Sequence, residues 1–318
     1  MKFTKTAVAV AIAGIASAPM IASADTVLSG VVEIQLTGSD ADGDNNDGDD
    51  DLDDAGDARF AADDVLFGIQ AEHALNVGLT GYGSLRVDIN RLSDEGRTTI
   101  DPGTPGNDED DIEISEFGSA DAVYVGIKGG FGDVRLGEIP VAVELGQVAN
   151  DIFDVTGDIT GGISYTGGFG PATIVANFSP EENEDVIGIG GKLSFAGIGI
   201  SAGYEDRDDS DRFAVGATYG IAGVSLGAHY WTIDDGGSVG DLESFSVQLG
   251  YGFAGVSGAL TFSALEDDDP IDSEAVRLDL SYGLGGGMTV SSRITAESDN
   301  AVGGTDLTSW RIKLSKSF

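Results

Sequence analysis

The chain contains no cysteine and has few basic residues for its size. Without cysteine, neither disulfides nor thiol chemistry contributes to its stability or function. Its 16 Lys and Arg stand against 55 Asp and Glu, giving a formal net charge of −39 that opposes nucleic-acid binding. No run of about 18 apolar residues follows residue 24, which excludes transmembrane helices from the rest of the sequence.

The first residues have the pattern of an export signal. Two lysines precede a small apolar stretch at 7–21, and Ala-Ser-Ala at 22–24 offers an A-x-A cleavage site. We therefore predict a secretory signal peptide at 1–24, whose removal leaves a single mature domain at 25–318. The alternative interpretation of the first segment is a buried N-terminal helix.

Glycine is abundant, at 49 residues, and no sustained 3.6-residue hydrophobic period occurs. A helical fold does not tolerate so much glycine. Alternation of apolar and polar residues instead predicts sixteen strands. These strands are expected at 26–37, 58–72, 79–91, 119–128, 133–139, 159–167, 172–179, 185–195, 198–206, 211–219, 223–233, 242–252, 256–265, 273–283, 288–297 and 307–318.

The connections between these strands alternate in character. One set is short and glycine-rich, as at 129–132 and 252–255, whereas the other is acidic and often longer, as at 38–57, 92–118 and 140–158. Short turns at one rim and long loops at the other are typical of outer-membrane barrels with an even strand number. A closed barrel also leaves no free strand edge, as lipid requires. We therefore predict an all-β fold, a transmembrane antiparallel β-barrel of 16 strands.

Alternation within the strands indicates which face meets lipid. At 273–283, Val276 and Leu278 oppose Arg277 and Asp279. An apolar exterior with a charged interior predicts a wet lumen, and sixteen strands enclose enough space for an aqueous channel. This parity places six bases in the lumen, which are Arg86, Arg135, Arg277, Arg293, Arg311 and Lys313. Two acids, Asp88 and Asp279, lie beside them.

The last strand, 307–318, combines two features. Trp310, Ile312, Leu314 and Phe318 fall on one parity, opposite basic and polar residues. A final strand of this kind that ends on an aromatic residue resembles the closing strand of bacterial outer-membrane barrels. The resemblance implies that Trp310 and Phe318 belong to an assembly signal read by the barrel-assembly machinery, after export through the periplasm of a Gram-negative bacterium.

Internal motifs carry a more specific resemblance. The sequence LFGIQAE at 66–72, then LTGYG at 79–83, VYVGIKGGFGDVRLG at 123–137 and GGISYT at 161–166, is similar in order and spacing to the general diffusion porins of Gram-negative bacteria. That resemblance implies a barrel of sixteen strands, usually assembled as a homotrimer in outer-membrane lipid. It also implies that the third extracellular loop folds into the lumen as a constriction.

In this sequence the third loop corresponds to 139–158, which contains no Lys or Arg. In the family, acids on this loop face arginines on the barrel wall; the acids here are Glu144, Asp151, Asp154 and Asp158. The positions that match the family's usual arginines hold Leu66, Asp121, Glu138 and Asp158. Because acidic rings favour cations, we expect a cation preference. The alternative is that Arg86 or Arg135 occupies the constriction and balances its charge.

The acidic loop at 38–57 holds ten Asp. Asp42, Asp44 and Asn46 begin like a calcium loop, but the glycine comes one residue late and no Glu closes the loop. We interpret the segment as a solvated extracellular loop, with metal binding as the alternative. The acidity of the whole chain also fits a saline habitat, in which salt screens self-repulsion.

No sequence pattern for an enzyme or a cofactor site is visible. His73 and His229 lack a partner motif, and Tyr230 and Trp231 beside His229 are interpreted as part of an interfacial aromatic girdle. We therefore expect no enzymatic activity and no cofactor. Two functions remain: a passive channel for small hydrophilic solutes and ions, and an adhesin or structural barrel whose acidic loops bind cations.

Overall fold

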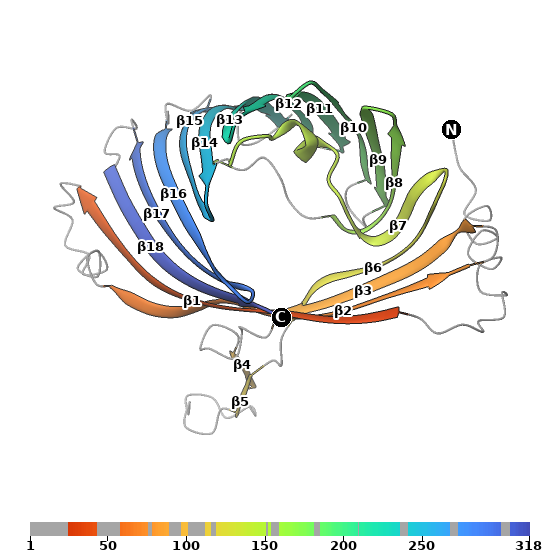
Figure 1. Ribbon diagram of the computed structural model, residues 1–318, viewed down its shortest axis with the longest axis horizontal. Coiled ribbons are helices and arrows are strands. Elements are labelled where there is room, and N and C mark those ends of the chain that lie inside the picture. The colour runs from red at the N-terminus through yellow and green to blue at the C-terminus, as the bar shows by residue number, and fades with distance from the viewer. Residues whose placement is uncertain are drawn as a thin grey trace.

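The computed structural model describes residues 25–42, 58–75, 78–88, 97–100, 112–115, 119–150, 152–153, 159–180, 185–208, 210–235, 241–267, 273–299 and 306–318. Within these residues sixteen antiparallel strands form one closed barrel around a wide opening (Figure 1). The predicted signal peptide at 1–24 lies outside the described residues. Within the described part, no helix has the length and apolar character needed to cross a membrane.

Each barrel strand pairs with the next one in the chain, except that β3 pairs with β6. The sixteen barrel strands are β1 (Asp25–Asp42), β2 (Arg59–Ala74), β3 (Thr80–Asp88), β6 (Ser119–Gly129), β7 (Gly132–Ile139), β8 (Ile159–Phe169), β9 (Ala172–Pro180), β10 (Asp185–Phe195), β11 (Ile198–Arg207), β12 (Ser210–Ile221), β13 (Val224–Asp235), β14 (Leu242–Phe253), β15 (Val256–Asp267), β16 (Ser273–Gly285), β17 (Met288–Asp299) and β18 (Asp306–Ser317). The prediction of a sixteen-stranded antiparallel barrel is confirmed.

One element was not predicted. The sequence 92–118 was expected to be a loop, but it contains a two-stranded hairpin of β4 (Arg97–Ile100) and β5 (Ile112–Ser115). Figure 1 shows this hairpin outside the ring of strands. The hairpin explains why β3 pairs with β6, because β4 and β5 pair with each other and take no place in the barrel.

The first and last strands close the barrel. The Gly30 N–H donates a hydrogen bond to the Phe318 carbonyl at 3.0 Å, and the Phe318 N–H donates to the Gly30 carbonyl at 3.1 Å. The Phe318 ring lies over Gly30, where an added Cβ would come within 2.4 Å of it. Trp310 lies over Gly38 in the same way, with 2.8 Å to an added Cβ. The two aromatic side chains of the last strand therefore cover glycines of β1.

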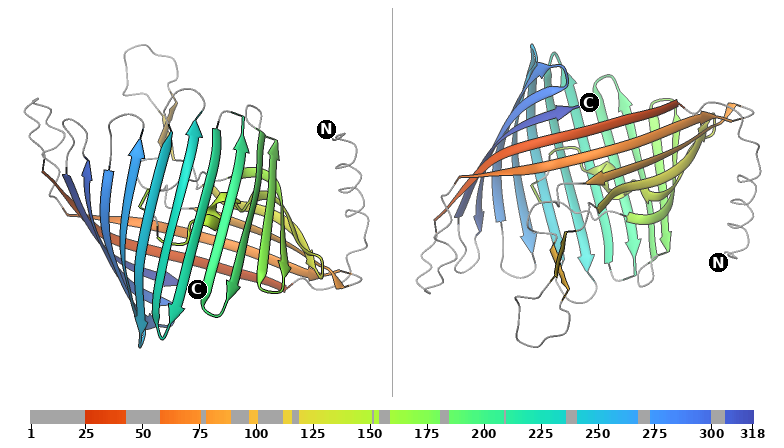
Figure 2. Two further views of the ribbon diagram at one scale, coloured as in Figure 1. Left: turned by 90° about the horizontal axis from the view of Figure 1, so that it is seen from above. Right: turned by 90° about the horizontal axis from the view of Figure 1, so that it is seen from below.

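The exposed large hydrophobic side chains lie mainly on the outward-facing parity of the strands. On β16, Val276 and Leu278 are 45% and 38% exposed, whereas Arg277 between them is 7% exposed. The strands are inclined and cross the barrel wall obliquely, as Figure 2 shows. An exposed apolar band of this kind requires a lipid neighbour, because water would penalise so much hydrophobic surface.

A β-bulge interrupts the pairing of β1 with β2. The register shifts between Val32 and Ile34, so that Glu33 lies opposite the adjacent pair Asp63 and Asp64. A bulge places two consecutive residues against one residue of the partner strand. Both aspartates consequently approach the same glutamate on one face of the sheet.

Three hairpins turn through the dipeptide Ala-Gly. At the β14–β15 turn, Ala254 has φ 51° and Gly255 has φ 84°. Positive φ at both central residues is the type I′ geometry, whose twist matches that of the strands. The turns at 196–197 and 222–223 repeat it. Glycine in second place avoids the Cβ penalty of this conformation.

Gly255→Ala should lower the free energy of unfolding by about 1 kcal/mol, because an alanine at φ 84° brings Cβ close to the following carbonyl. An added Cβ there meets nothing closer than Tyr282 Cε2 at 3.7 Å, so the backbone conformation alone carries the cost. Urea unfolding of the protein in lipid vesicles measures the change. Gly283→Ala is the control, since its Cβ meets nothing within 4 Å and its φ is not positive. Equal effects of both substitutions would contradict the turn argument.

Candidate functional site

The inner face of the barrel wall divides into regions of different chemistry. An acidic cluster lies on β1 and β2, where the carboxylate oxygens of Glu33, Asp63 and Asp64 lie within 4.8 Å of one another. Lys313 of β18 reaches this cluster, with its Nζ 2.6 Å from Glu33 Oε2 and 3.0 Å from Asp63 Oδ2. The lysine supplies the counter-charge, so the arrangement is an ion-pair cluster.

These three acids were not predicted to form a site. Two adjacent aspartates, Asp63 and Asp64, break the two-residue period of their strand, and such a break is the sequence signal of a bulge. The partner Glu33 could not be identified from the sequence, because its position opposite the pair depends on the register of β1 against β2.

A basic region follows on β16 to β18. Arg277 Nε lies 3.1 Å from Asp279 Oδ2, and Arg293 Nε lies 2.6 Å from Asp279 Oδ1. A single carboxylate thus pairs with two guanidinium groups. Arg311 is the register partner of Arg293 on the adjacent strand. The predicted lumen bases Arg277, Arg293, Arg311 and Lys313 therefore gather on three neighbouring strands.

The wall of β3, β6 and β7 carries a third polar region. The Arg135 guanidinium carbon lies 4.2 Å from the centre of the Tyr124 ring, a cation–π contact. The Tyr82 hydroxyl donates a hydrogen bond to Asp133. Arg86 and Asp88 lie on the same face of β3 as Tyr82, with Arg86 exposed and Asp88 partly buried. Neither Arg86 nor Arg135 belongs to the basic region of β16 to β18.

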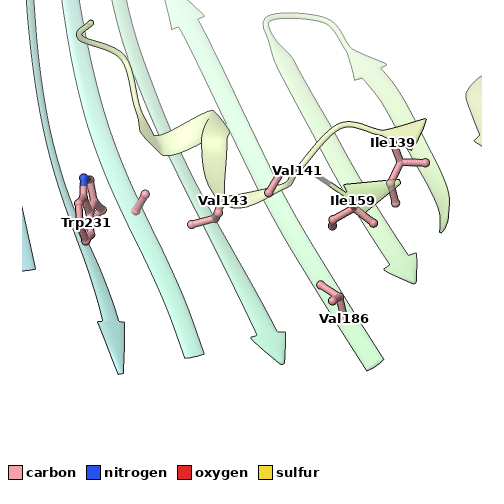
Figure 3. Packing of buried hydrophobic residues seen from close by; sticks show 7 residues of the cluster. Ile139, Val141, Val143, Ile159, Val186 and Trp231 are labelled. Atoms are coloured by element: carbon pink, nitrogen blue, oxygen red, sulfur yellow. The ribbon is translucent and has the colours of Figure 1, made fainter. Parts of the chain in front are cut away.

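The connection from β7 to β8 packs against the wall instead of leaving it. Residues 140–150, which we call the β7–β8 segment, contain a single 3₁₀ turn, η6 (Val143–Gly146). Figure 1 draws this segment on the inner side of the ring, along β10 to β13. Val141 and Val143 join Ile139, Val186 and Trp231 in a buried hydrophobic cluster (Figure 3). Burial of these side chains holds the segment against the strands.

Polar side chains of the wall bind the backbone of the segment. Glu205 of β11 is fully buried, and its Oε1 accepts a hydrogen bond from the Ala142 N–H at 3.0 Å. His229 Nδ1 of β13 accepts from the Ala149 N–H at 3.2 Å. Further along the wall, the Arg277 guanidinium donates to the Asn150 carbonyl at 2.6 Å. Side chains from β11, β13 and β16 therefore fix the path of the segment.

Glycines on the wall permit this close approach. An added Cβ on Gly203 of β11 would lie 2.2 Å from the Ala142 carbonyl oxygen. On Gly216 of β12 it would lie 2.3 Å from the Gly146 carbonyl oxygen. No side chain fits in either gap, because the nearest obstructing atom is a backbone carbonyl oxygen in both cases. The segment occupies the space that these missing side chains leave.

The interpretation of Trp231 as part of an interfacial aromatic girdle was wrong, because Trp231 and the nearby His229 both face inward. Both side chains are 2% exposed and lie on the inner face, where Trp231 Nε1 donates to the Phe153 carbonyl at 3.1 Å. Trp231 was assigned to the girdle because it lies near the predicted end of its strand, and the direction of its side chain was not taken into account. The alternation along β13 assigns Trp231 to the inner face. Outward-facing residues such as Leu226 alternate there with the residues of the inward parity, which are Ser225, Gly227, His229 and Trp231.

The remaining predicted site residues fall into two groups. Glu144 is exposed on η6, and Glu138 is partly buried near the end of β7. Leu66 lies on β2, opposite Asp88 of β3. Residues outside the described part, in whole or for their side chains, are Asp42, Asp44, Asn46, Asp121, Asp151, Asp154 and Asp158.

Comparison with known proteins identifies the family. A family model described as Gram-negative porin matches residues 6–290. No curated protein matches the chain. Among solved structures, the anion-selective porin from Comamonas acidovorans is 16% identical with a TM-score of 0.71, and the match covers 93% of this chain and 100% of that one.

Two further structures share the fold. The trimer form of OmpT, an outer membrane protein of Vibrio cholerae, is 14% identical with a TM-score of 0.69, over 93% of this chain and 100% of the other. OmpF of Salmonella typhi, in a complex with daunomycin, is 14% identical with a TM-score of 0.65, over 92% and 97%. With the family match over most of its length, the chain belongs to the Gram-negative porins, the channel proteins of the outer membrane.

Proposed function

We propose that the chain forms a water-filled channel through which small hydrophilic solutes and ions diffuse passively across the outer membrane. One observation carries this proposal: charged and hydroxyl side chains line the inner face of a sixteen-stranded barrel whose outer face is hydrophobic. A barrel of this strand number leaves an aqueous lumen. Passive diffusion needs no chemical step, so the proposal includes neither a catalytic residue nor a cofactor.

We further propose that the β7–β8 segment is the constriction of this channel. Its contacts with β10 to β13 support that role, because they hold a stretch of backbone on the inner side of the wall. The exposed carboxylate of Glu144 then faces the passing solute, and the proposed selectivity is for cations. The anion-selective Comamonas porin shares the fold, so the charges of the lumen decide the sign of the selectivity.

The proposed assembly is a homotrimer in outer-membrane lipid. The trimer form of the Vibrio cholerae protein supports this state. We also propose that the barrel-assembly machinery recognises β18 through Trp310 and Phe318. Both side chains lie at the seam with β1, the last pairing needed to close the barrel.

Liposomes that contain the folded protein should swell in isotonic solutions of small sugars, at rates that fall as the sugar becomes larger. Diffusion through a water-filled lumen of fixed width has this size dependence. Light scattering measures the swelling rate, and liposomes without protein provide the control. If folded protein produces no swelling with any sugar, the channel proposal fails and the adhesin or structural barrel replaces it.

Under a KCl gradient in a planar bilayer, the zero-current potential should have the sign of cation selectivity. Glu144→Gln should reduce the cation-to-anion permeability ratio by roughly two- to fivefold, the effect expected of one charge at close range in water. Glu274→Gln removes the same charge from the outward-facing parity of β16 and should change the ratio little. Anion selectivity of the wild type would contradict the proposed filter.

Gly216→Val should decrease single-channel conductance, because its side chain would displace the backbone of Gly146 and push the segment away from the wall into the lumen. Planar-bilayer recordings measure the conductance. A difference in electrophoretic mobility between heated and unheated samples that equals that of the wild type shows that the barrel is folded. The control is Gly191→Ala, whose Cβ meets only the Thr173 carbonyl oxygen at an ordinary 3.6 Å. Wild-type conductance in a folded Gly216→Val protein would show that the segment does not limit flow.

A further inference from the structure

A pocket opens in the inner wall where β13 to β18 meet the end of the β7–β8 segment. Its cavity volume is about 450 Å³. Asn150 of the segment borders it on one side, and Arg293 and Arg311 border it on another. Binding sites for small molecules typically have volumes in this range.

Arg311 stands apart from the ion pairs of this region. Arg277 holds the Asn150 carbonyl and pairs with Asp279, and Arg293 pairs with the same carboxylate. Lys313 pairs with Glu33 and Asp63. Arg311 has no ion-pair or hydrogen-bond partner among the residues that the structure describes. The pocket therefore contains one guanidinium group that no carboxylate of the described chain neutralises.

Strand register makes this guanidinium group unfavourable without a ligand. Arg311 of β18 is the direct partner of Arg293 of β17. Like charges directly opposite each other in an antiparallel pair destabilise it. Asp279 approaches Arg293 from β16, the side away from Arg311. An anion bound beside Arg311 would relieve the repulsion.

The rest of the pocket offers hydroxyl and amide groups. Ser257 and Ser281 contact each other through their hydroxyls at 2.8 Å, and Ser225 and Ser291 also line the wall. Gln248 donates its amide to Thr261 Oγ1 at 3.1 Å, which leaves its carbonyl oxygen as an acceptor. These groups match the hydroxyls of a polyol, since each donates or accepts hydrogen bonds.

We propose that this pocket is a solute subsite for small hydroxylated carboxylates, such as sugar acids, with Arg311 binding the carboxylate. A guanidinium group matches a carboxylate through two parallel hydrogen bonds, whereas it offers no such match to an uncharged sugar. The single free guanidinium selects a single carboxylate. The subsite rests on the proposed function: it retains such solutes at the wall of β17 and β18, whereas the proposed cation filter, Glu144, lies on η6.

Saturation-transfer NMR on the folded protein in detergent tests the proposal with gluconate as the probe. Gluconate should bind more tightly than glucose, which lacks the carboxylate, and than acetate, which lacks the hydroxyls. Arg311→Gln should weaken gluconate binding by about tenfold or more, the usual loss for a hydrogen-bonded charge. Arg311→Lys should give an intermediate affinity because it retains the charge without the planar fork.

The matched control is Lys192→Gln, which removes an exposed cation of the inward parity of β10, outside the pocket. It should leave gluconate binding unchanged. Equal weakening by the Arg311 and Lys192 substitutions would overturn the subsite, and so would wild-type binding of gluconate no tighter than that of glucose or acetate. Conductance of the same preparation in KCl separates the two proposals. Conductance without gluconate binding overturns the subsite alone, whereas gluconate binding without conductance overturns the channel alone.

Discussion

The barrel depends on one constraint: backbone N–H and C=O groups that face hydrocarbon must find partners within the protein. A sheet satisfies this requirement only when its first and last strands pair, as β1 and β18 do here along twelve residue pairs. The same closure separates two environments. Side chains of one parity then face lipid and those of the other face water, so the hydrophobic pattern of the chain is the inverse of a soluble protein's.

Closure also creates a concave wall on which a further segment can pack. The β7–β8 segment makes a small hydrophobic core with this wall and satisfies part of its backbone through Glu205, His229 and Arg277. Its position is thus a property of several strands distant in sequence. Burial of a glutamate such as Glu205 is costly unless its oxygens are hydrogen-bonded, and here they bind the Ala142 N–H and the Arg207 guanidinium.

Strand periodicity was sufficient to predict the sixteen barrel strands, because each one alternates between lipid and water over most of its length. The β4–β5 hairpin escaped prediction, since it lies outside that alternation. Pairing between distant residues escaped it as well. The approach of Glu33 to Asp63 requires the bulge and the register of β1, and the contact of His229 with Ala149 requires the path of a segment that has no periodicity.

The glycines beneath the β7–β8 segment offer a route by which the width of such channels can change during evolution. Gly203 and Gly216 lie on the inward parity of their strands, so substitutions there leave the lipid-facing surface and the strand pairing untouched. Each change from glycine to a larger residue moves the segment by the thickness of a side chain. Evolution can therefore alter the bore in small steps, one wall position at a time, while membrane insertion and barrel size stay constant.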